Sequence, residues 1–188
     1  ETMTELIEYY KGIFTILSSC ASRQLEEVTF RRTVIPVQEL LDAAGKYFKK
    51  SMKNRSERIE LEIEPMEAKV IGDVNQLRFL LENLIDEALT VREDGVIRLQ
   101  ARLDNEYIRF LFTDTRREKS VEELNQLFYP NLARMTSGEK GELRGTEYLV
   151  CKQIIRDHDE FAGRRGCRIN AEPAEGGGFT VYFTIPHR

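Results

Sequence analysis

Hydrophobic residues recur at helical spacing most clearly between Gly72 and Leu89. The apolar positions of this stretch share one helix face: Val74, Leu77, Leu80, Leu81, Leu84, Ile85 and Ala88. Asn83 and Glu87 lie one turn apart on an edge of that stripe. The pattern predicts an amphipathic helix. Its polar pair either faces a ligand or forms the solvated boundary of the helix, which is the commoner case.

A second stripe runs through the first thirty residues. Its members follow near-heptad spacing: Leu6, Tyr9, Ile13, Ile16 and Cys20. Such a stripe predicts a helix that needs a partner, because a lone helix has no way to bury it. We therefore expect a helical segment over residues 1–30, a separate domain over 31–188, and a homodimer formed through the N-terminal helix.

The remaining patterns alternate between helices and strands. We interpret 33–36 as a break, followed by an amphipathic helix that starts near Pro36. Period-two alternation predicts strands over 59–63, 96–103 and 107–112, the last two joined by an Asp104-Asn105 turn. Helices are expected over 121–128 and 146–157, on either side of a loop rich in Gly, Glu and Lys, and final strands over 167–171 and 179–185.

Composition narrows the classes of protein. The 188 residues, 41% hydrophobic and 32% charged, allow one sizeable core with a short appendage. A formal net charge of −4 does not indicate the basic surface with which proteins bind nucleic acid. No apolar run of this fragment is long enough to span a bilayer. Cys20, Cys151 and Cys167 lack CxxC spacing and favour buried free thiols in a reducing compartment. Because the chain opens at Glu1 inside a helical pattern, we expect it to be a fragment of a longer protein.

Three motifs resemble those of sensor histidine kinases. Residues 72–89 resemble the family's N box, 122–130 (EELNQLFYP) its F box, and 177–186 (GGFTVYFTIP) its closing strand. The resemblance runs from about residue 30 to residue 186. It implies the histidine-kinase-like (Bergerat, or GHKL) ATPase fold, an α/β (α+β) two-layer sandwich, here with an N-terminal dimerisation-type helix.

The boxes that surround the adenine and the metal depart from the family. Where the N box places a magnesium-binding asparagine, this chain has Glu87, which can ligate Mg²⁺ but adds negative charge beside a triphosphate. In the family's DxGxG box, the carboxylate accepts a hydrogen bond from the adenine amino group. The matching residues 114–118 keep Asp114 but replace both glycines, with Arg116 and Glu118. Asp114 is equally typical of a turn at a strand end.

The phosphate-binding GxGxG box has also lost most of its glycines. Residues 151–158 resemble the family's xKQIxxxH helix and place Leu143, Gly145 and Glu147 on the three glycine positions. A register shifted by two residues leaves Glu147 and Leu149 on the last two, so the phosphate cradle is lost in either case. We expect Lys140, Arg144 and Arg116 either to compensate as donors to phosphate or to be solvated.

The histidines complete this picture. A sensor kinase carries a phosphoacceptor histidine, followed by Glu or Asp, on the first helix of its dimerisation hairpin. This chain has only His158, expected to terminate its helix, and His187 in the C-terminal tail. The N-terminal helix would then correspond to the second helix of the hairpin.

The resemblance and its departures together predict a catalytically degenerate histidine-kinase ATPase-like module that signals through protein interactions. We expect no catalytic residue, no resident cofactor, and a vestigial nucleotide pocket made of Asn83, Glu87, Asp114 and Gly145, with Glu87 as its weak Mg²⁺ ligand. One alternative is an active kinase that binds ATP and Mg²⁺ and carries its histidine upstream of Glu1. The other is a scaffold that only dimerises. Cytoplasmic residence is implied, including the cytoplasmic part of a membrane-bound sensor.

Overall fold

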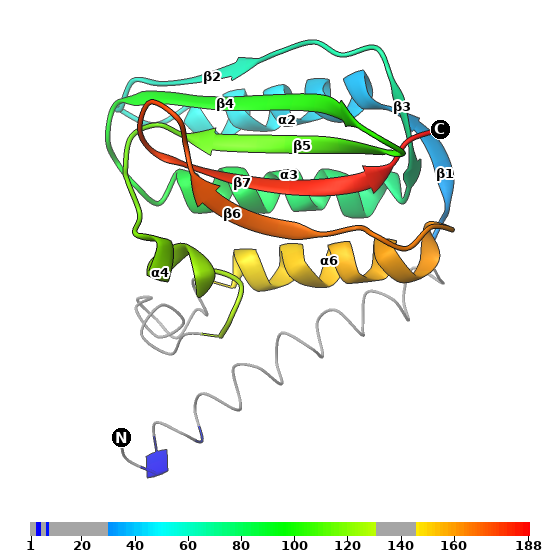
Figure 1. Ribbon diagram of the computed structural model, residues 1–188. Coiled ribbons are helices and arrows are strands. Elements are labelled where there is room, and N and C mark those ends of the chain that lie inside the picture. Colours follow the sequence, from blue (N-terminus) through cyan, green and yellow to red (C-terminus); the bar gives the residue numbers. More distant parts are fainter. Residues whose placement is uncertain (1–2, 5–6, 8–29, 131–145) are drawn as a thin grey trace.

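The computed structural model describes residues 3, 4, 7, 30–130 and 146–188 (Figure 1). Its helices and strands are, in chain order, β1 (Thr33–Pro36), α2 (Val37–Met52), β2 (Ile59–Ile63), β3 (Lys69–Gly72), α3 (Val74–Ala88), β4 (Gly95–Asp104), β5 (Tyr107–Asp114), α4 (Val121–Asn125), α6 (Glu147–Phe161), β6 (Ile169–Pro173) and β7 (Phe179–Pro186). The apolar stripe of the expected N-terminal helix lies outside the described residues, so that helix and the dimer stay predictions. No helix in the described ranges is both long and apolar enough to cross a bilayer.

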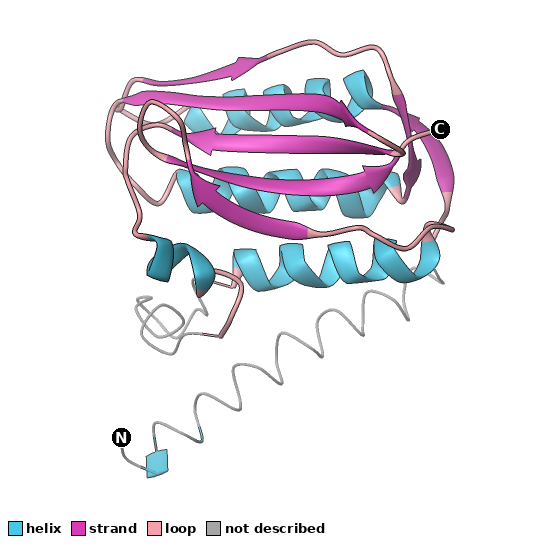
Figure 2. Ribbon diagram, in the orientation of Figure 1, coloured by secondary structure: helices cyan, strands magenta, loops and turns pink. Residues whose placement is uncertain are grey.

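The strands form one main sheet and one small ladder. The main sheet has the order β2-β4-β5-β7-β6, in which β2 and β4 are parallel and the other pairs antiparallel. Helices α2, α3 and α6 lie side by side behind this sheet, and its other face is not covered by any described helix (Figure 2). The predicted two-layer α/β architecture is confirmed.

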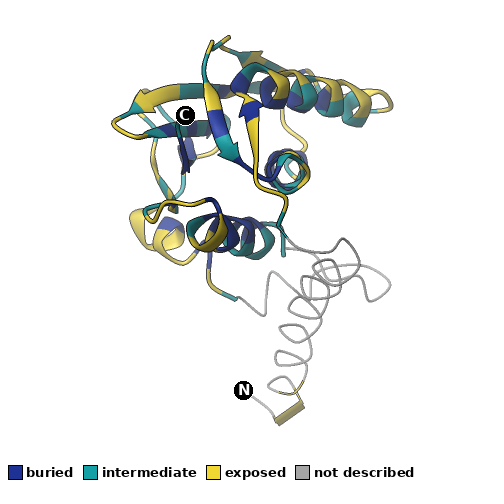
Figure 3. Cartoon of the chain, turned by 90° about the vertical axis from the view of Figure 1, so that its right-hand side faces the viewer, coloured by how far each residue is buried: buried dark blue, intermediate teal, exposed yellow. Residues whose placement is uncertain are grey.

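The hydrophobic core lies between the sheet and these helices. Along β5, the buried Ile108, Phe110 and Phe112 alternate with the partly exposed Arg109 and Leu111, as period-two patterning requires. Figure 3 shows the buried positions turned toward the space between sheet and helices. Fully burying side chains of this kind stabilises the fold by roughly 1.5–3 kcal/mol each.

Two elements differ from the sequence-based predictions. The expected break at 33–36 is strand β1, which pairs with β3 and places Ile35 opposite Val70. The expected helix 121–128 stops at Asn125. It begins with a capping box in which the Ser120 hydroxyl accepts from the Glu123 amide at 3.1 Å. The other predicted helices and strands are confirmed to within a few residues.

The two described cysteines, Cys151 and Cys167, are free and buried, as expected. Burial raises the pKa of both thiols, in Cys167 to about 12. Neither thiol is therefore a nucleophile near neutral pH. Cys20 lies outside the described residues.

Candidate nucleotide pocket

Helix α3 is fixed at its start by Asp73, its N-cap residue. One carboxylate oxygen, Oδ1, accepts from the amides of Asn75 at 3.0 Å and Gln76 at 3.1 Å. These bonds satisfy amides that an uncapped helix leaves free. The cap thereby sets where the N-box helix begins and which of its faces meets the sheet.

Asn83 does not lie on a solvated boundary, which corrects the commoner interpretation of its pattern. The residue is 8% exposed, and its side-chain amide donates to the Phe79 carbonyl at 2.7 Å. This bond turns the amide back onto the preceding turn of its own helix. Asn83 is thus buried beside the pocket, with one amide hydrogen already used by the backbone.

Asp114 ends β5 and is bound on both oxygens by Arg116. Oδ1 accepts from Arg116 Nε, and Oδ2 accepts from Arg116 Nη2, each at 2.9 Å. The backbone amide of Arg116 also donates to Oδ1 at 3.0 Å, so the expected turn at the strand end is present as well. The pair is a bidentate ion pair whose side chains are only 5% and 1% exposed.

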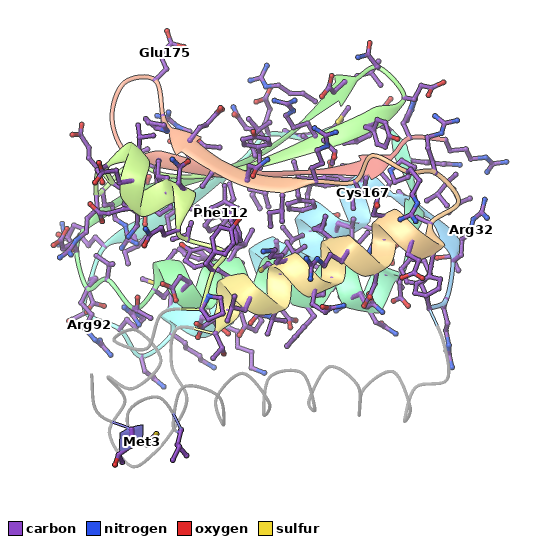
Figure 4. The ribbon with its side chains drawn as sticks, turned by 60° about the horizontal axis from the view of Figure 1, so that its bottom comes forward. Met3, Arg32, Arg92, Phe112, Cys167 and Glu175 are labelled. Carbon is purple, nitrogen blue, oxygen red and sulfur yellow. The ribbon has the colours of Figure 1, made fainter. Side chains whose placement is uncertain are left out.

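The rest of the Arg116 guanidinium is bound by the loop that follows α3. Nη1 donates to the carbonyls of Val91 at 2.9 Å and Glu93 at 3.0 Å, and Nη2 donates to Ala88 at 2.6 Å. Together with the two bonds to Asp114, these use all five N–H donors of a guanidinium. In Figure 4, Arg92 of this loop points outward, whereas Phe112, two residues before Asp114, points into the core.

Gly95 makes room for this side chain. A Cβ at that position would lie 2.5 Å from Arg116 Cγ, and the glycine has φ +150°. Arg116 was expected either to donate to phosphate or to be solvated, but here its five side-chain donors are bound within the chain and the side chain is 1% exposed. The carboxylate that would bind an adenine amino group is likewise engaged within the chain.

The phosphate end of the expected pocket is acidic where the structure describes it. Glu147 is the first residue of α6, and its Oε2 is buried without a hydrogen-bond partner among the described residues. Burial raises the pKa of Cys151, and the charges of Glu147 and Glu87 raise it further. Both carboxylates therefore act on one region between α3 and α6. Lys140, Leu143, Arg144 and Gly145 lie outside the described residues.

His158 is a buried link between α6 and α3. Its Nδ1 lies 2.8 Å from the Ile154 carbonyl, and its Nε2 lies 3.1 Å from the Asp73 amide, which donates to it. Burial lowers its pKa to about 4, so the ring is neutral at physiological pH. The helix continues to Phe161, beyond the expected end at residue 157, and His158 is the basic residue of its last turn.

Asp114 is engaged by Arg116, and Glu87 and Glu147 bring negative charge to one region between α3 and α6. Within residues 30–130 and 146–188, no three His, Cys, Asp or Glu side chains are grouped as around a metal ion.

Comparison with known proteins identifies the same type of domain. The family model described as "Histidine kinase-, DNA gyrase B-, and HSP90-like ATPase" matches residues 72–188. A mycobacterial sensor histidine kinase, MprB, superposes with a TM-score of 0.63 at 19% identity, covering 84% of this chain and 99% of that one. The catalytic domain of histidine kinase ThkA gives 0.65 at 21% identity, covering 83% and 95%. A search of curated proteins finds no match.

A further solved structure contains histidine kinase ThkA in complex with the response regulator protein TrrA. It matches with a TM-score of 0.64 at 19% identity and covers 100% of this chain and 52% of that one. At these identities the structural matches show the fold.

Proposed function

Since this chain belongs to the histidine kinase-, DNA gyrase B- and HSP90-like ATPase family, we propose that it is a catalytically degenerate module of a two-component-type signalling protein. In this proposal the domain acts through protein interactions and uses no resident cofactor. The observation that carries the proposal is the complete engagement of Asp114 by Arg116.

The energetic argument starts from the buried ion pair. To accept a hydrogen bond from adenine, Asp114 has to release a guanidinium that is otherwise surrounded by carbonyl oxygens. Separating a buried pair in this way costs roughly 3–5 kcal/mol, which weakens a dissociation constant by about two to four powers of ten. Repulsion of the phosphates by Glu87 and Glu147 weakens ATP further.

The histidines support the same proposal. A phosphoacceptor has to present an exposed imidazole beside a base. The His158 ring is fully buried and hydrogen bonded, and the His187 backbone pairs with Val70 in an isolated bridge. We assign no catalytic residue to the described part of the chain.

The proposed partners are a second copy of the chain, bound through the N-terminal helix, and other signalling proteins. The neighbour solved in complex with a response regulator supports a receiver-type protein as one such partner. We place the domain in the cytoplasm, either free or as the cytoplasmic part of a membrane-bound sensor, as the family membership suggests.

Calorimetry with ATP, ADP and adenosine, with and without Mg²⁺, tests the proposal. We expect dissociation constants in the millimolar range or no measurable binding. Adenosine should gain nothing from Asp114 while Arg116 holds it. A low micromolar, magnesium-dependent constant for ATP that Asp114→Ala abolishes would establish the active-kinase alternative instead.

A second experiment separates signalling from the dimerisation-scaffold alternative. A receiver-domain protein is titrated against the chain by analytical ultracentrifugation, with the unmodified chain and the Ile13→Asp variant compared. Signalling by interaction predicts a complex whose affinity changes with the oligomeric state. Dimerisation without any receiver complex supports the scaffold.

A further inference from the structure

Helix α2 carries a row of lysines on its outer side. Lys46, Lys49, Lys50 and Lys53 are all exposed and recur at the spacing of one helix face. We call these four residues the lysine stripe. The buried residues of the helix lie on the opposite side and face the core: Val37, Leu40, Leu41, Ala44 and Phe48. Residues 46–58 hold six Lys or Arg and one Glu, in a chain whose formal net charge is −4.

The carboxylates that follow α2 or face it from α3 are engaged by other groups. Glu57 accepts from Arg55 at 3.2 Å and from Arg92 at 3.1 Å. Asp86 of α3 accepts from the Tyr47 hydroxyl at 2.7 Å. Among residues 30–130 and 146–188, no ion pair includes a lysine of the stripe. The charge of the stripe is therefore left for a partner outside the domain.

The stripe is not explained by the stability of α2. Lys46 and Lys50 lie one turn apart, as do Lys49 and Lys53, and like charges at this spacing destabilise a helix. The helix dipole favours cations in the last turn, which accounts for Lys49 and Lys50 but not for Lys46. A helix face that is only solvated typically mixes both signs of charge. Four cations without an intervening carboxylate are the pattern of a binding surface.

We propose that the lysine stripe docks the domain on an anionic lipid surface. Clusters of four or more basic residues on an amphipathic helix are typical of contact with anionic headgroups. Lysine ammonium groups are hydrated point charges on flexible stems, which suit a layer of headgroups, whereas nucleic-acid recognition favours arginine and stacked aromatic rings. The rings beside the stripe are not free to stack, because Phe48 is buried and the Tyr47 hydroxyl is bound to Asp86.

The position of α2 suits a flat partner. This helix is the outermost of its layer, with α3 between it and α6 (Figure 1). From Lys46 to Lys53 the stripe extends about 10 Å along the helix axis, so one plane can meet all four ammonium groups. Contact of this kind needs no spanning helix. It goes beyond the proposed function, and it does not depend on whether the region between α3 and α6 binds nucleotide.

Co-sedimentation of the full chain with lipid vesicles tests the docking surface. We expect binding to vesicles of equal parts phosphatidylcholine and phosphatidylserine, and none to vesicles of phosphatidylcholine alone. Raising the salt concentration from about 0.1 M to about 1 M shortens the Debye length from about 10 Å to about 3 Å and should release the protein.

The double substitution Lys46→Gln with Lys50→Gln locates the contact. Each lysine contributes a factor of about five to binding at an anionic surface, so this variant should bind about 25-fold more weakly. The matched control, Lys69→Gln with Arg168→Gln, removes the same charge from two exposed positions outside α2 and should bind like the unmodified chain. Because Lys46 and Lys50 repel each other, the first variant should melt at the same temperature as the unmodified chain or higher, which separates lost docking from lost folding.

Acetylation of lysines by an N-hydroxysuccinimide ester, followed by mass spectrometry, gives a second measurement. Anionic vesicles should protect the lysine stripe and leave Lys69 reactive. The proposal is overturned by no binding to anionic vesicles, by equal weakening in the two double variants, or by labelling of the stripe that vesicles leave unchanged. Tighter binding to a short DNA duplex than to anionic vesicles at the same salt concentration would assign the stripe to nucleic acid instead. Nucleotide calorimetry concerns other helices, so either proposal can fail without the other.

Discussion

Replacing Arg116 with alanine removes the side chain that binds both oxygens of Asp114. The substitution deletes five donors at once and leaves Asp114 as a buried carboxylate without its cation. The carbonyls of Ala88 and Val91 lose the guanidinium donor as well. Asp114 keeps the backbone amide of residue 116, and the Ala88 carbonyl keeps the Val91 amide, but the charge of Asp114 is left uncompensated unless water enters the space.

The size of the effect follows from the charge that remains. Removing one partner of a buried ion pair costs about 3–5 kcal/mol, and an unsatisfied buried carbonyl costs roughly 1–3 kcal/mol. These terms overlap, because water that enters the space solvates several of the groups together. We expect the free energy of unfolding to fall by about 3–5 kcal/mol, out of the 5–15 kcal/mol typical of a domain.

Arg117→Ala is the matched control, since it removes the same side chain one residue later. Arg117 is 57% exposed and pairs with Glu93 on the surface, so its loss should leave the free energy of unfolding nearly unchanged. Urea unfolding followed by circular dichroism gives both values. Guanidinium is unsuitable as the denaturant because the cation itself fits the vacated acceptors.

Binding of free guanidinium to the acceptors left by Arg116 gives a second measurement. Millimolar guanidinium or methylguanidine should raise the melting temperature of Arg116→Ala and leave that of Arg117→Ala unchanged. If the two variants differ by less than about 0.5 kcal/mol and guanidinium rescues neither, the assignment of Arg116 as the buried ligand of Asp114 is wrong.

Four further predictions concern other residues. Gly95→Ala should destabilise the domain by about 2–4 kcal/mol in urea unfolding, because its Cβ meets Arg116, whereas Gly176→Ala, with φ +86° and no neighbour within 4 Å, should cost about 1 kcal/mol. The free energy of unfolding should fall by up to about 3 kcal/mol between pH 6.5 and pH 4, since the unfolded state binds a proton that the folded His158, with its pKa of about 4, refuses. His158→Gln should remove this part of the pH dependence, and an identical slope in the variant would contradict it. Ile13→Asp should convert a dimer into a folded monomer by light scattering, whereas an unmodified chain that is monomeric at high micromolar concentration would disprove the dimer. Radiolabel from ATP should not enter the chain, and acid-labile label lost in His158→Ala would show that the chemistry had been misplaced.

The long helices and strands were predictable from sequence because buried hydrophobic residues recur in them at a regular spacing. Helices α2, α3 and α6 and the β4–β5 hairpin all follow such repeats. Strand β1 did not, because four residues give too few repeats and its burial depends on pairing with β3. The early end of α4 was missed for a related reason, since its first turn is fixed by a cap rather than by an apolar stripe.

The candidate site was only half predictable. The resemblance to the family marked both residues, and it left Asp114 as an adenine ligand or a turn residue and Arg116 as a phosphate donor or a solvated side chain. Their spacing of two residues at a strand end was the available signal for a local pair. The three carbonyls that complete the arrangement lie 23 to 28 residues earlier in the chain, and no pattern in the sequence marks them. The bond between His158 and Asp73 spans 85 residues and is equally invisible.

The side-chain hydrogen bonds that Asp114 makes here are all to Arg116. A carboxylate at the end of β5 can have two different roles. It can accept a hydrogen bond from a ligand when the neighbouring residues are glycines, and it can neutralise a buried cation when one of these residues is arginine. Here a side chain stands at Arg116, where the family has a glycine, and a glycine at Gly95 leaves room for its aliphatic stem. The guanidinium then satisfies backbone carbonyls that a folded chain has to pair in any case. The same carboxylate is thus explained by the stability of the domain, and whether this domain binds ATP depends on the cost of displacing Arg116.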